Sequence, residues 1–239
     1  MLFKTPLVRG TLIKRYKRFL ADVTLDDGTV VTAHTANSGS MMGCCEPGSE
    51  VWLSPADNPE RKLKWTWELI RVGDGLVGIN TSWPNALVAE ACAEGLIPEV
   101  AGYDTVRREV KYGKNSRIDV LLEKADGSRC YVEVKNVTLA RDGHAEFPDA
   151  VTARGAKHLV EMTDMVAEGH RAVMVYLVQR EDCEAFRVAA DIDPAYRDAL
   201  ALAMSKGVEA VCWACRVTPE GITVARPLPL RLDAPLAVA

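Results

Sequence analysis

Three side chains near the middle of the chain have types and spacing suited to hydrolysis. Residues 116–138 read SRIDVLLEKADGSRCYVEVKNVT, with charged residues alternating with apolar ones. Strand side chains point to opposite faces of a sheet in turn, so Glu133 and Lys135 share one face. The Asp-Gly pair at 126–127 is typical of a hairpin turn, and a hairpin closed there would bring Asp119 close to both of them.

Two carboxylates and a lysine on one patch of sheet fit the hydrolysis of a phosphodiester. Carboxylates hold Mg²⁺ or Mn²⁺ through oxygen and leave positions for water and a phosphate oxygen. The Lys135 ammonium could orient the attacking water or stabilise charge that develops on the phosphate. The alternative is an ordinary edge strand, in which an acid and a base form a weak pair on a solvated face.

Length, charge and cysteine usage limit the class of protein. The chain has 239 residues, 48% of them hydrophobic, which suffices for a sizeable core in one or two domains. Its 29 basic and 33 acidic side chains give a net charge of −4, so any nucleic-acid binding must use local patches. Seven scattered cysteines indicate reduced thiols, and we expect Cys212 and Cys215 to be packing residues. Without a signal-like or membrane-length apolar segment, a cytoplasmic protein with no membrane partner is expected.

Residues 1–80 are expected to form a small β-barrel. Short strand patterns are separated by Gly, Pro and Asn, and no long helical pattern interrupts them. Basic residues stand among aromatic ones, a mixture typical of surfaces that follow a nucleic-acid backbone and stack on bases. A solvated strand pair with its aromatic residues in the core is the alternative. The nucleic-acid-binding candidates in this half are Lys14, Arg15, Lys17 and Arg18.

Residues 81–239 alternate helical and strand patterns, which predicts an α/β domain. An apolar run without alternation at 171–178 is typical of a central strand buried on both faces. Proline near the start and glycine near the end mark two of the three helical patterns. The expected helices span 84–95, 148–169 and 193–206, and the expected strands lie at 105–111, in the hairpin 116–138, and at 171–178, 208–217 and 221–225.

Further charged residues flank the carboxylate patch. Glu90 lies in the first expected helix, where it is either a solvent-facing helix former or an acid aimed at the patch. Positive side chains beside the patch suit a polyanionic substrate, although a solvated helix face explains those in the helix 148–169 about as well. The nucleic-acid-binding candidates in this half are Arg117, Arg154 and Lys157.

Asp119 followed by Glu133-Val134-Lys135 resembles the PD-(D/E)xK nuclease superfamily, with Ile118 in place of the proline in that name. Longer segments of the chain are more specific: FLADV at 19–23, AHTANSGSM at 33–41, RIDVLL at 117–122, VEVKNVTL at 132–139 and FPDAVTARGAKHL at 147–159. These segments resemble the sugar fermentation stimulation protein A (SfsA) family, and the resemblance runs from near the N-terminus to about residue 230.

The resemblance implies an α/β (α+β) protein with an N-terminal OB-like β-barrel, residues 1–80, followed by a PD-(D/E)xK restriction-endonuclease-like α/β domain, residues 81–239. It implies DNA as the partner. It also implies a catalytic set of Asp119, Glu133, Glu90 and Lys135, in which the three acids hold Mg²⁺ or Mn²⁺.

Two functions from different classes follow from these observations. One is a Mg²⁺- or Mn²⁺-dependent phosphodiesterase that acts on DNA. The other is a non-catalytic, sequence-nonspecific DNA-binding regulator of sugar (maltose) metabolism genes. The intact Asp/Glu/Lys set favours the first, because acids that face a polyanion repel it unless a cation is present. A sugar- or nucleotide-binding metabolic protein is a third hypothesis, but the sequence has no dinucleotide or phosphate-binding fingerprint. The sequence leaves the oligomeric state open.

Overall fold

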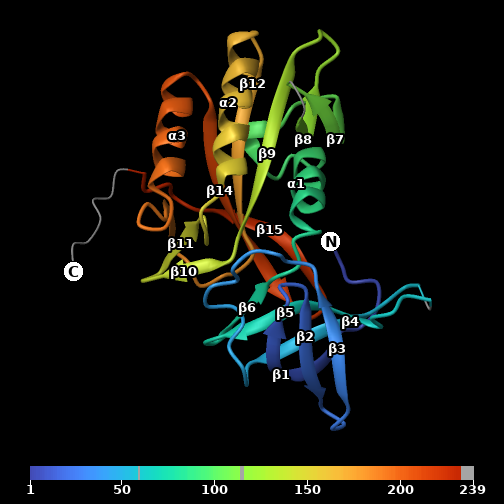
Figure 1. Cartoon of the computed structure of the whole chain (residues 1–239). Helices are drawn as coiled ribbons and strands as arrows, with labels where there is room; N and C mark the ends of the chain where they lie inside the picture. The colour runs from blue at the N-terminus through green and yellow to red at the C-terminus, as the bar shows by residue number, and fades with distance from the viewer. Residues whose placement is uncertain (59, 114–115, 233–239) are drawn as a thin grey trace.

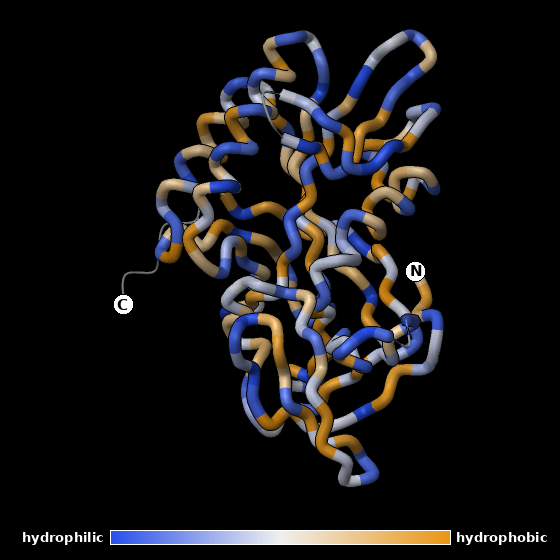
Figure 2. Tube along the Cα trace, turned by 45° about the vertical axis from the view of Figure 1, so that its right-hand side comes forward, coloured by the Kyte–Doolittle hydropathy of each residue, from blue (hydrophilic) through white to orange (hydrophobic). Residues whose placement is uncertain are grey.

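The computed structural model describes residues 1–58, 60–113 and 116–232 and has two lobes, a β-barrel and an α/β unit (Figure 1). Each lobe has hydrophobic residues in its interior, and hydrophilic residues gather at the outer turns, such as the turn between the second and third strands at the bottom of Figure 2.

The first lobe is a closed barrel. Its first strand pairs antiparallel with the second and the fourth, and a parallel pairing between the third and the fifth closes the ring. Alternate side chains such as Leu12, Val23 and Trp67 point inward and are fully buried. This topology confirms the predicted OB-like barrel. The barrel strands are β1 (Val8–Tyr16), β2 (Leu20–Leu25), β3 (Val30–Thr35), β4 (Glu50–Pro55) and β5 (Trp65–Val72).

A mixed sheet forms the middle of the second lobe. Its order is β15-β14-β12-β9-β8-β7. The central strands β9, β12 and β14 run parallel, and antiparallel strands flank them on both sides. The apolar run at 171–178 is β12, and seven of its eight residues are buried, as predicted for a central strand. The strands are β7 (Thr105–Tyr112), β8 (Ser116–Glu123), β9 (Arg129–Val137), β12 (Arg171–Val178), β14 (Glu209–Thr218) and β15 (Gly221–Pro227).

Helices cover both faces of this sheet. The helices α2 (Ala153–Ala167) and α3 (Pro194–Ser205) pack against one face, and α1 (Pro84–Ala93) packs against the other, with a short 3₁₀ turn at Pro98–Val100 after it. The helices of the described residues are too short or too polar to span a lipid bilayer. Cys212 and Cys215 are buried free thiols in β14, which agrees with a packing role.

The helix expected at 148–169 begins later than predicted. Its N-cap is Thr152, whose hydroxyl accepts a hydrogen bond from the Gly155 N–H. The helix begins there because the threonine side chain satisfies one of the backbone N–H groups that the first turn leaves without a partner, which a proline at 148 does not. Two short strands before this helix form a small sheet with a third strand from later in the chain, and this sheet was not predicted. Its strands are β10 (Leu139–Arg141), β11 (His144–Phe147) and β13 (Ala185–Val188).

The strand that follows the barrel and the first residues of the chain are among the segments that join the lobes. The strand β6 (Gly75–Gly78) extends the barrel sheet from β5, and the Gly78 N–H donates to the Gln179 carbonyl at 2.9 Å. The N-terminal arm, residues 1–5, leaves the barrel, and Leu2 forms a bridge with Gly221 at the start of β15. The first residues therefore contact the second lobe, and the division at residue 80 stays a prediction.

Candidate functional site

The strands β8 and β9 separate at the predicted carboxylate patch. Their paired positions run from Glu123 opposite Arg129 to Val120 opposite Val132 and end there. Beyond that point the Asp119 side chain takes the place of a backbone acceptor, since its Oδ2 accepts the Val134 N–H at 2.8 Å. The gap between the strands thus holds the carboxylate in one orientation.

The start of α1 holds the other oxygen of Asp119. The Asn85 side chain donates to Asp119 Oδ1 at 2.7 Å and to Glu109 Oε1 at 3.0 Å. Sequence reasoning missed Asn85, although its place directly after Pro84 put it in the first turn of a predicted helix. Two neutral donors from different elements therefore fix the Asp119 carboxylate.

Glu133 lies in the centre of β9, and only 2% of its surface is exposed. Its Oε1 accepts a hydrogen bond from Lys135 Nζ at 2.8 Å and is in close contact with His158 Nδ1 from α2. Its Oε2 is also buried and has no hydrogen-bond partner in the part of the chain that the structure describes. A buried carboxylate oxygen without a partner is costly, and it is the kind of atom that a bound cation would satisfy.

The charges of these groups depend on each other. Burial, followed by the negative charge of Glu133, raises the pKa of Asp119 to about 6. Burial would also raise the pKa of Glu133, but the hydrogen bonds from His158 and Lys135 outweigh it and leave this pKa below its ordinary value. The structure thus brings Asp119, Glu133 and Lys135 into one electrostatically coupled group.

His158 is a second residue of the site for which the sequence offered no clear signal. It is 5% exposed and lies in α2 one turn after Arg154, whose Nε donates to His158 Nε2 at 3.4 Å. Because Nε2 accepts this hydrogen bond, the network assigns the ring proton to Nδ1, which then donates to Glu133. The signal available in the sequence was the spacing of four residues between Arg154 and His158, which places both on one face of a helix.

Glu90 does not join the group, which corrects its predicted role as a third acid. It follows Asn85 by five helical positions, which turns its side chain about 140° away around the helix axis. Its carboxylate is half-exposed and pairs with the N-terminal amine of Met1 at 3.2 Å. It lines a small cavity with Thr223 of β15, and β15 lies four strand spacings from β8, about 19 Å across the sheet.

The site therefore offers two carboxylates to a cation. Within residues 1–58, 60–113 and 116–232, no three His, Cys, Asp or Glu side chains are grouped so as to hold a metal ion. This arrangement still fits Mg²⁺, which proteins usually bind through one or two carboxylates together with waters and substrate phosphates. The donor set is all oxygen, as a hard divalent cation requires.

The basic candidates of the second lobe lie near the site. Lys157 is more than half exposed and contacts Ser116 Oγ at 3.3 Å, and its Nζ lies 3.6 Å from Glu161. Arg117 is exposed on β8, next to Asp119, and Arg154 contacts His158 as described.

The basic candidates of the barrel divide into two kinds. The Arg15 guanidinium donates to the carbonyls of Arg18, Asn37 and Gly39 at 2.8–2.9 Å and to that of a fourth residue at 3.3 Å. Burial lowers its pKa. These contacts give Arg15 a structural role, and its DNA contact stays a prediction. Three exposed basic residues remain on this surface: Lys14, Lys17 and Arg18.

Comparison with known proteins gives consistent results for both lobes. The SfsA N-terminal OB domain matches residues 13–79, and the sugar fermentation stimulation protein RE domain matches residues 82–221. The sugar fermentation stimulation protein homologue of Paramagnetospirillum magneticum is 66% identical and covers 97% of this chain and 98% of its own length. The homologue of Rhodospirillum rubrum is 65% identical and covers 96% of this chain and 99% of its own length.

A solved structure has the same fold. Pyrococcus furiosus SfsA in complex with Ca²⁺ superposes with a TM-score of 0.87 at 24% identity, covering 97% of this chain and 98% of that one. Its likeness supports an OB barrel followed by an α/β domain. Given the matched domains and the identity to relatives over nearly their whole length, the chain belongs to the SfsA family.

Proposed function

We propose that this protein binds DNA and hydrolyses its phosphodiester backbone with Mg²⁺ or Mn²⁺ held by Asp119 and Glu133. The observation that carries the proposal is the buried Oε2 of Glu133, which has no partner among the described residues and belongs to the same coupled group as Asp119. The P. furiosus relative, which is described in complex with Ca²⁺, supports a divalent cation.

The side chains around the carboxylates have distinct roles in this proposal. Lys135 and His158 both bind Oε1 of Glu133, which would leave Oε2 free to hold a cation. When bound, the cation would polarise the phosphate and lower the pKa of a coordinated water. The Lys135 ammonium, which is mostly buried beside Glu133, would hold the attacking water or stabilise the charge on the phosphate oxygens.

DNA binding would use local basic patches because the whole chain is net acidic. In the second lobe, Arg117, Arg154 and Lys157 lie near the carboxylates. In the barrel, Lys14, Lys17 and Arg18 are exposed. Phosphate contacts of this kind position the backbone without reading its sequence.

The test is a cleavage assay with linear, circular and single-stranded DNA in Mg²⁺, Mn²⁺ or EDTA. We expect cleavage only with a cation, and its loss in Glu133→Ala, which also controls for a contaminating nuclease. Lys135→Ala should lose cleavage but still bind Mn²⁺ in a calorimetric titration, because lysine is not a ligand. Equal cleavage by wild type and Glu133→Ala would refute the assignment.

A second candidate function is a DNA-binding regulator that no longer cleaves. It is favoured by the finding that two acids, and not the predicted three, meet at the site in the described part of the chain. In that case the protein would bind DNA and Mn²⁺, and every DNA form would stay intact in every cation tested.

A further inference from the structure

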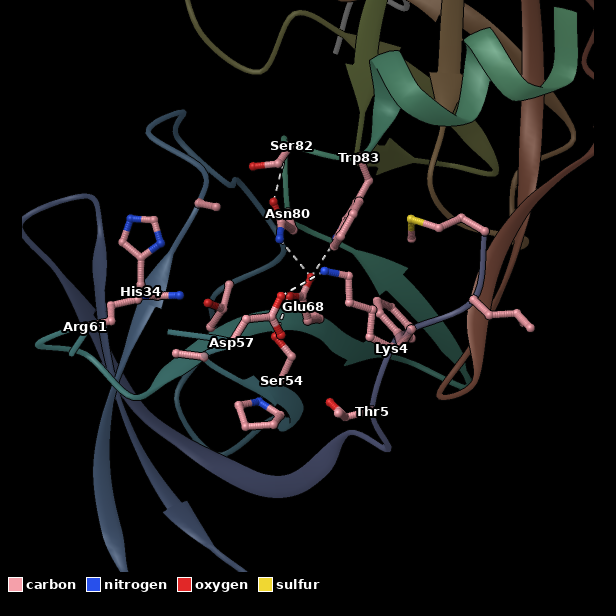
Figure 3. Close-up of a pocket in the computed structure, with 17 residues that line it drawn as sticks. Lys4, Thr5, His34, Ser54, Asp57, Arg61, Glu68, Asn80, Ser82 and Trp83 are labelled. Carbon is pink, nitrogen blue, oxygen red and sulfur yellow. Dashed lines mark hydrogen bonds and ion pairs between the residues drawn. The ribbon is translucent and has the colours of Figure 1, made fainter. Parts of the chain in front are cut away.

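A cavity of about 420 Å³ lies where the barrel meets the N-terminal arm and the start of α1 (Figure 3). Its walls come from β3, β4, β5 and the segment that follows β4. The volume is in the range of small-molecule sites, which occur preferentially where two domains meet. The proposed hydrolytic site uses none of the residues that line this cavity.

The floor of the cavity accepts hydrogen bonds. Glu68 is 2% exposed, and Figure 3 shows its carboxylate below Asn80 and Trp83. Ser54 Oγ donates to Oε1 at 2.7 Å, while Asn80 Nδ2 and Trp83 Nε1 donate to Oε2 at 2.8 and 2.7 Å. A carboxylate has about four lone-pair sites, and with one donor on it Oε1 can accept another hydrogen bond.

Flat side chains stand on opposite sides of this floor. On one side the Trp83 ring packs edge-to-face against Phe3, with ring centroids 6.5 Å apart. On the other side lies His34, and burial and the charge of Arg61 lower its pKa, which favours the neutral ring. Aromatic rings and a neutral imidazole suit a planar, uncharged group between them.

The side chains at the mouth of the cavity carry one net positive charge, that of Arg61. Lys4 pairs with Asp57 at 2.9 Å, but both side chains are more than two-thirds exposed, so the pair is weak and neutral overall. Among the described residues, Arg61 makes one long contact of 3.4 Å to the Trp65 carbonyl, which leaves further N–H groups for a ligand. An anionic group fits this position.

We propose that this cavity binds one unpaired nucleotide of a DNA strand, with an amino-bearing base against Glu68 and the phosphate at Arg61. From floor to mouth the cavity presents a hydrogen-bond acceptor, flat side chains and a cation. These would meet the edge of the base, the face of the base and the phosphate in the same order. Adenine, cytosine and guanine carry an amino donor, whereas thymine offers only an imide N–H between two carbonyl oxygens, which the Glu68 carboxylate repels. This proposal rests on the DNA binding proposed above, and it adds a base preference that the hydrolytic site does not supply.

Mononucleotide binding in EDTA tests the cavity without a cation at the hydrolytic site. We expect calorimetry to show dGMP, dAMP and dCMP binding about 10-fold more tightly than dTMP. Arg61→Ala should weaken all four, whereas Lys62→Ala, the adjacent exposed residue that does not line the cavity, should leave them unchanged. Ala56→Phe, designed to fill the cavity, should abolish binding, and its melting temperature would show that it folds.

Oligonucleotides identify the source of the nucleotide. Single-stranded dA and dC decamers should bind more tightly than a dT decamer, and Ala56→Phe should remove this preference. Equal binding of all four mononucleotides, or a base preference that survives in Ala56→Phe, would overturn the proposal. Mononucleotide binding together with oligonucleotide affinities that Ala56→Phe leaves unchanged would also overturn it.

The two proposals can fail separately. Metal-dependent cleavage that Glu133→Ala abolishes would still support the hydrolytic site if the cavity bound no nucleotide. Base-selective binding in EDTA would still support the cavity if no DNA were cut.

Discussion

At the scale of single residues, the two oxygens of Glu133 are not equivalent. Lys135 and His158 bind the same oxygen, and the other is left buried without a described partner. Because Arg154 donates to the far nitrogen of His158, the ring has one orientation in which its Nδ1–H meets Glu133. His158 is thus a positioning residue in the proposed site. The effect of a substitution at 158 on metal affinity should depend on whether the new side chain keeps a donor at the place of Nδ1 or of Nε2.

Substitution of His158 tests this dependence. An asparagine amide nitrogen takes nearly the place of Nδ1, whereas a glutamine amide nitrogen takes nearly that of Nε2. We expect His158→Asn to keep Mn²⁺ affinity close to that of wild type, and His158→Gln to lose about 10-fold to 100-fold, as is usual when a group that orients a metal ligand is removed. Electron paramagnetic resonance of free Mn²⁺ measures the affinity without a cleavage assay. Equal losses in both variants would indicate only a packing role.

The raised pKa of Asp119 predicts a pH-dependent effect of the cation. In the folded protein this pKa is about 6, above its ordinary 3.8, so the folded state holds the proton more tightly than the unfolded chain does. The contribution of Asp119 to the stability of the metal-free protein therefore falls as the pH rises from 3.8 to about 6. A cation binds the deprotonated form, so Mn²⁺ should raise the melting temperature at about pH 7.5 and lose this effect at about pH 5. A shift of equal size at both pH values would contradict the assignment of Asp119 as a ligand.

At the scale of elements, β6 depends on a glycine where the lobes meet. A Cβ at Gly78 would lie 2.6 Å from Gln179 Oε1 and 2.9 Å from Ile222 Cδ1, and both of those residues are fully buried. We expect Gly78→Ala to lower the free energy of unfolding by about 1–3 kcal/mol through overpacking. Gly75→Ala in the same strand is the control, because its Cβ would meet nothing closer than 3.8 Å. Urea denaturation of both variants measures the difference. Equal stability of the two would show that Gln179 and Ile222 move to make room for the added methyl group.

The turn between β1 and β2 should separate DNA binding from stability. Lys17 and Arg18 are exposed there, whereas Arg15 holds backbone carbonyls. Alanine at both 17 and 18 should weaken DNA binding and reduce the salt slope by about 2, because about two phosphate contacts are lost. Arg15→Ala should instead destabilise the fold by about 0.5–1.5 kcal/mol, because of the carbonyls that lose this donor only that of Asn37 is partly buried. An unchanged salt slope in the double variant would place the DNA surface elsewhere.

Several elements were predictable from sequence because their signals are local. The hairpin, the buried strand β12 and the helix starts at Pro84 and Pro194 follow from turn residues, apolar runs and caps. The strands β10, β11 and β13 have only three or four residues each, too few to show a periodicity, and the pairing of β11 with β13 joins distant segments. Glu90 was predicted wrongly because the helix start was clear but the rotation of the helix against the sheet was not. Contacts between elements also decide the roles of Asn85 and His158.

At the scale of the whole molecule, the lobes are joined at several separate places. The barrel loop after β3 enters the second lobe, where the Met41 N–H donates to Asp149 Oδ2 at 3.0 Å and the Cys44 thiol donates to the Thr138 carbonyl at 3.6 Å. The arm adds backbone hydrogen bonds to β15, and β6 adds one to Gln179. Met41 and Cys44 are fully buried even though they belong to a loop. Opening either lobe would therefore expose apolar surface of the other.

We accordingly expect the barrel and the α/β lobe to unfold together. Differential scanning calorimetry of the full chain should show one transition whose calorimetric enthalpy equals its van't Hoff enthalpy. Asp149→Ala should lower the midpoint, because it leaves the Met41 N–H without its acceptor, while Asp74→Ala, an exposed turn residue between β5 and β6, should not. Two resolved transitions in the wild-type chain would show that the contacts between the lobes are too weak to couple them. A cation at the proposed site would then stabilise only the α/β lobe, whereas a single transition means that the barrel shares in that stabilisation.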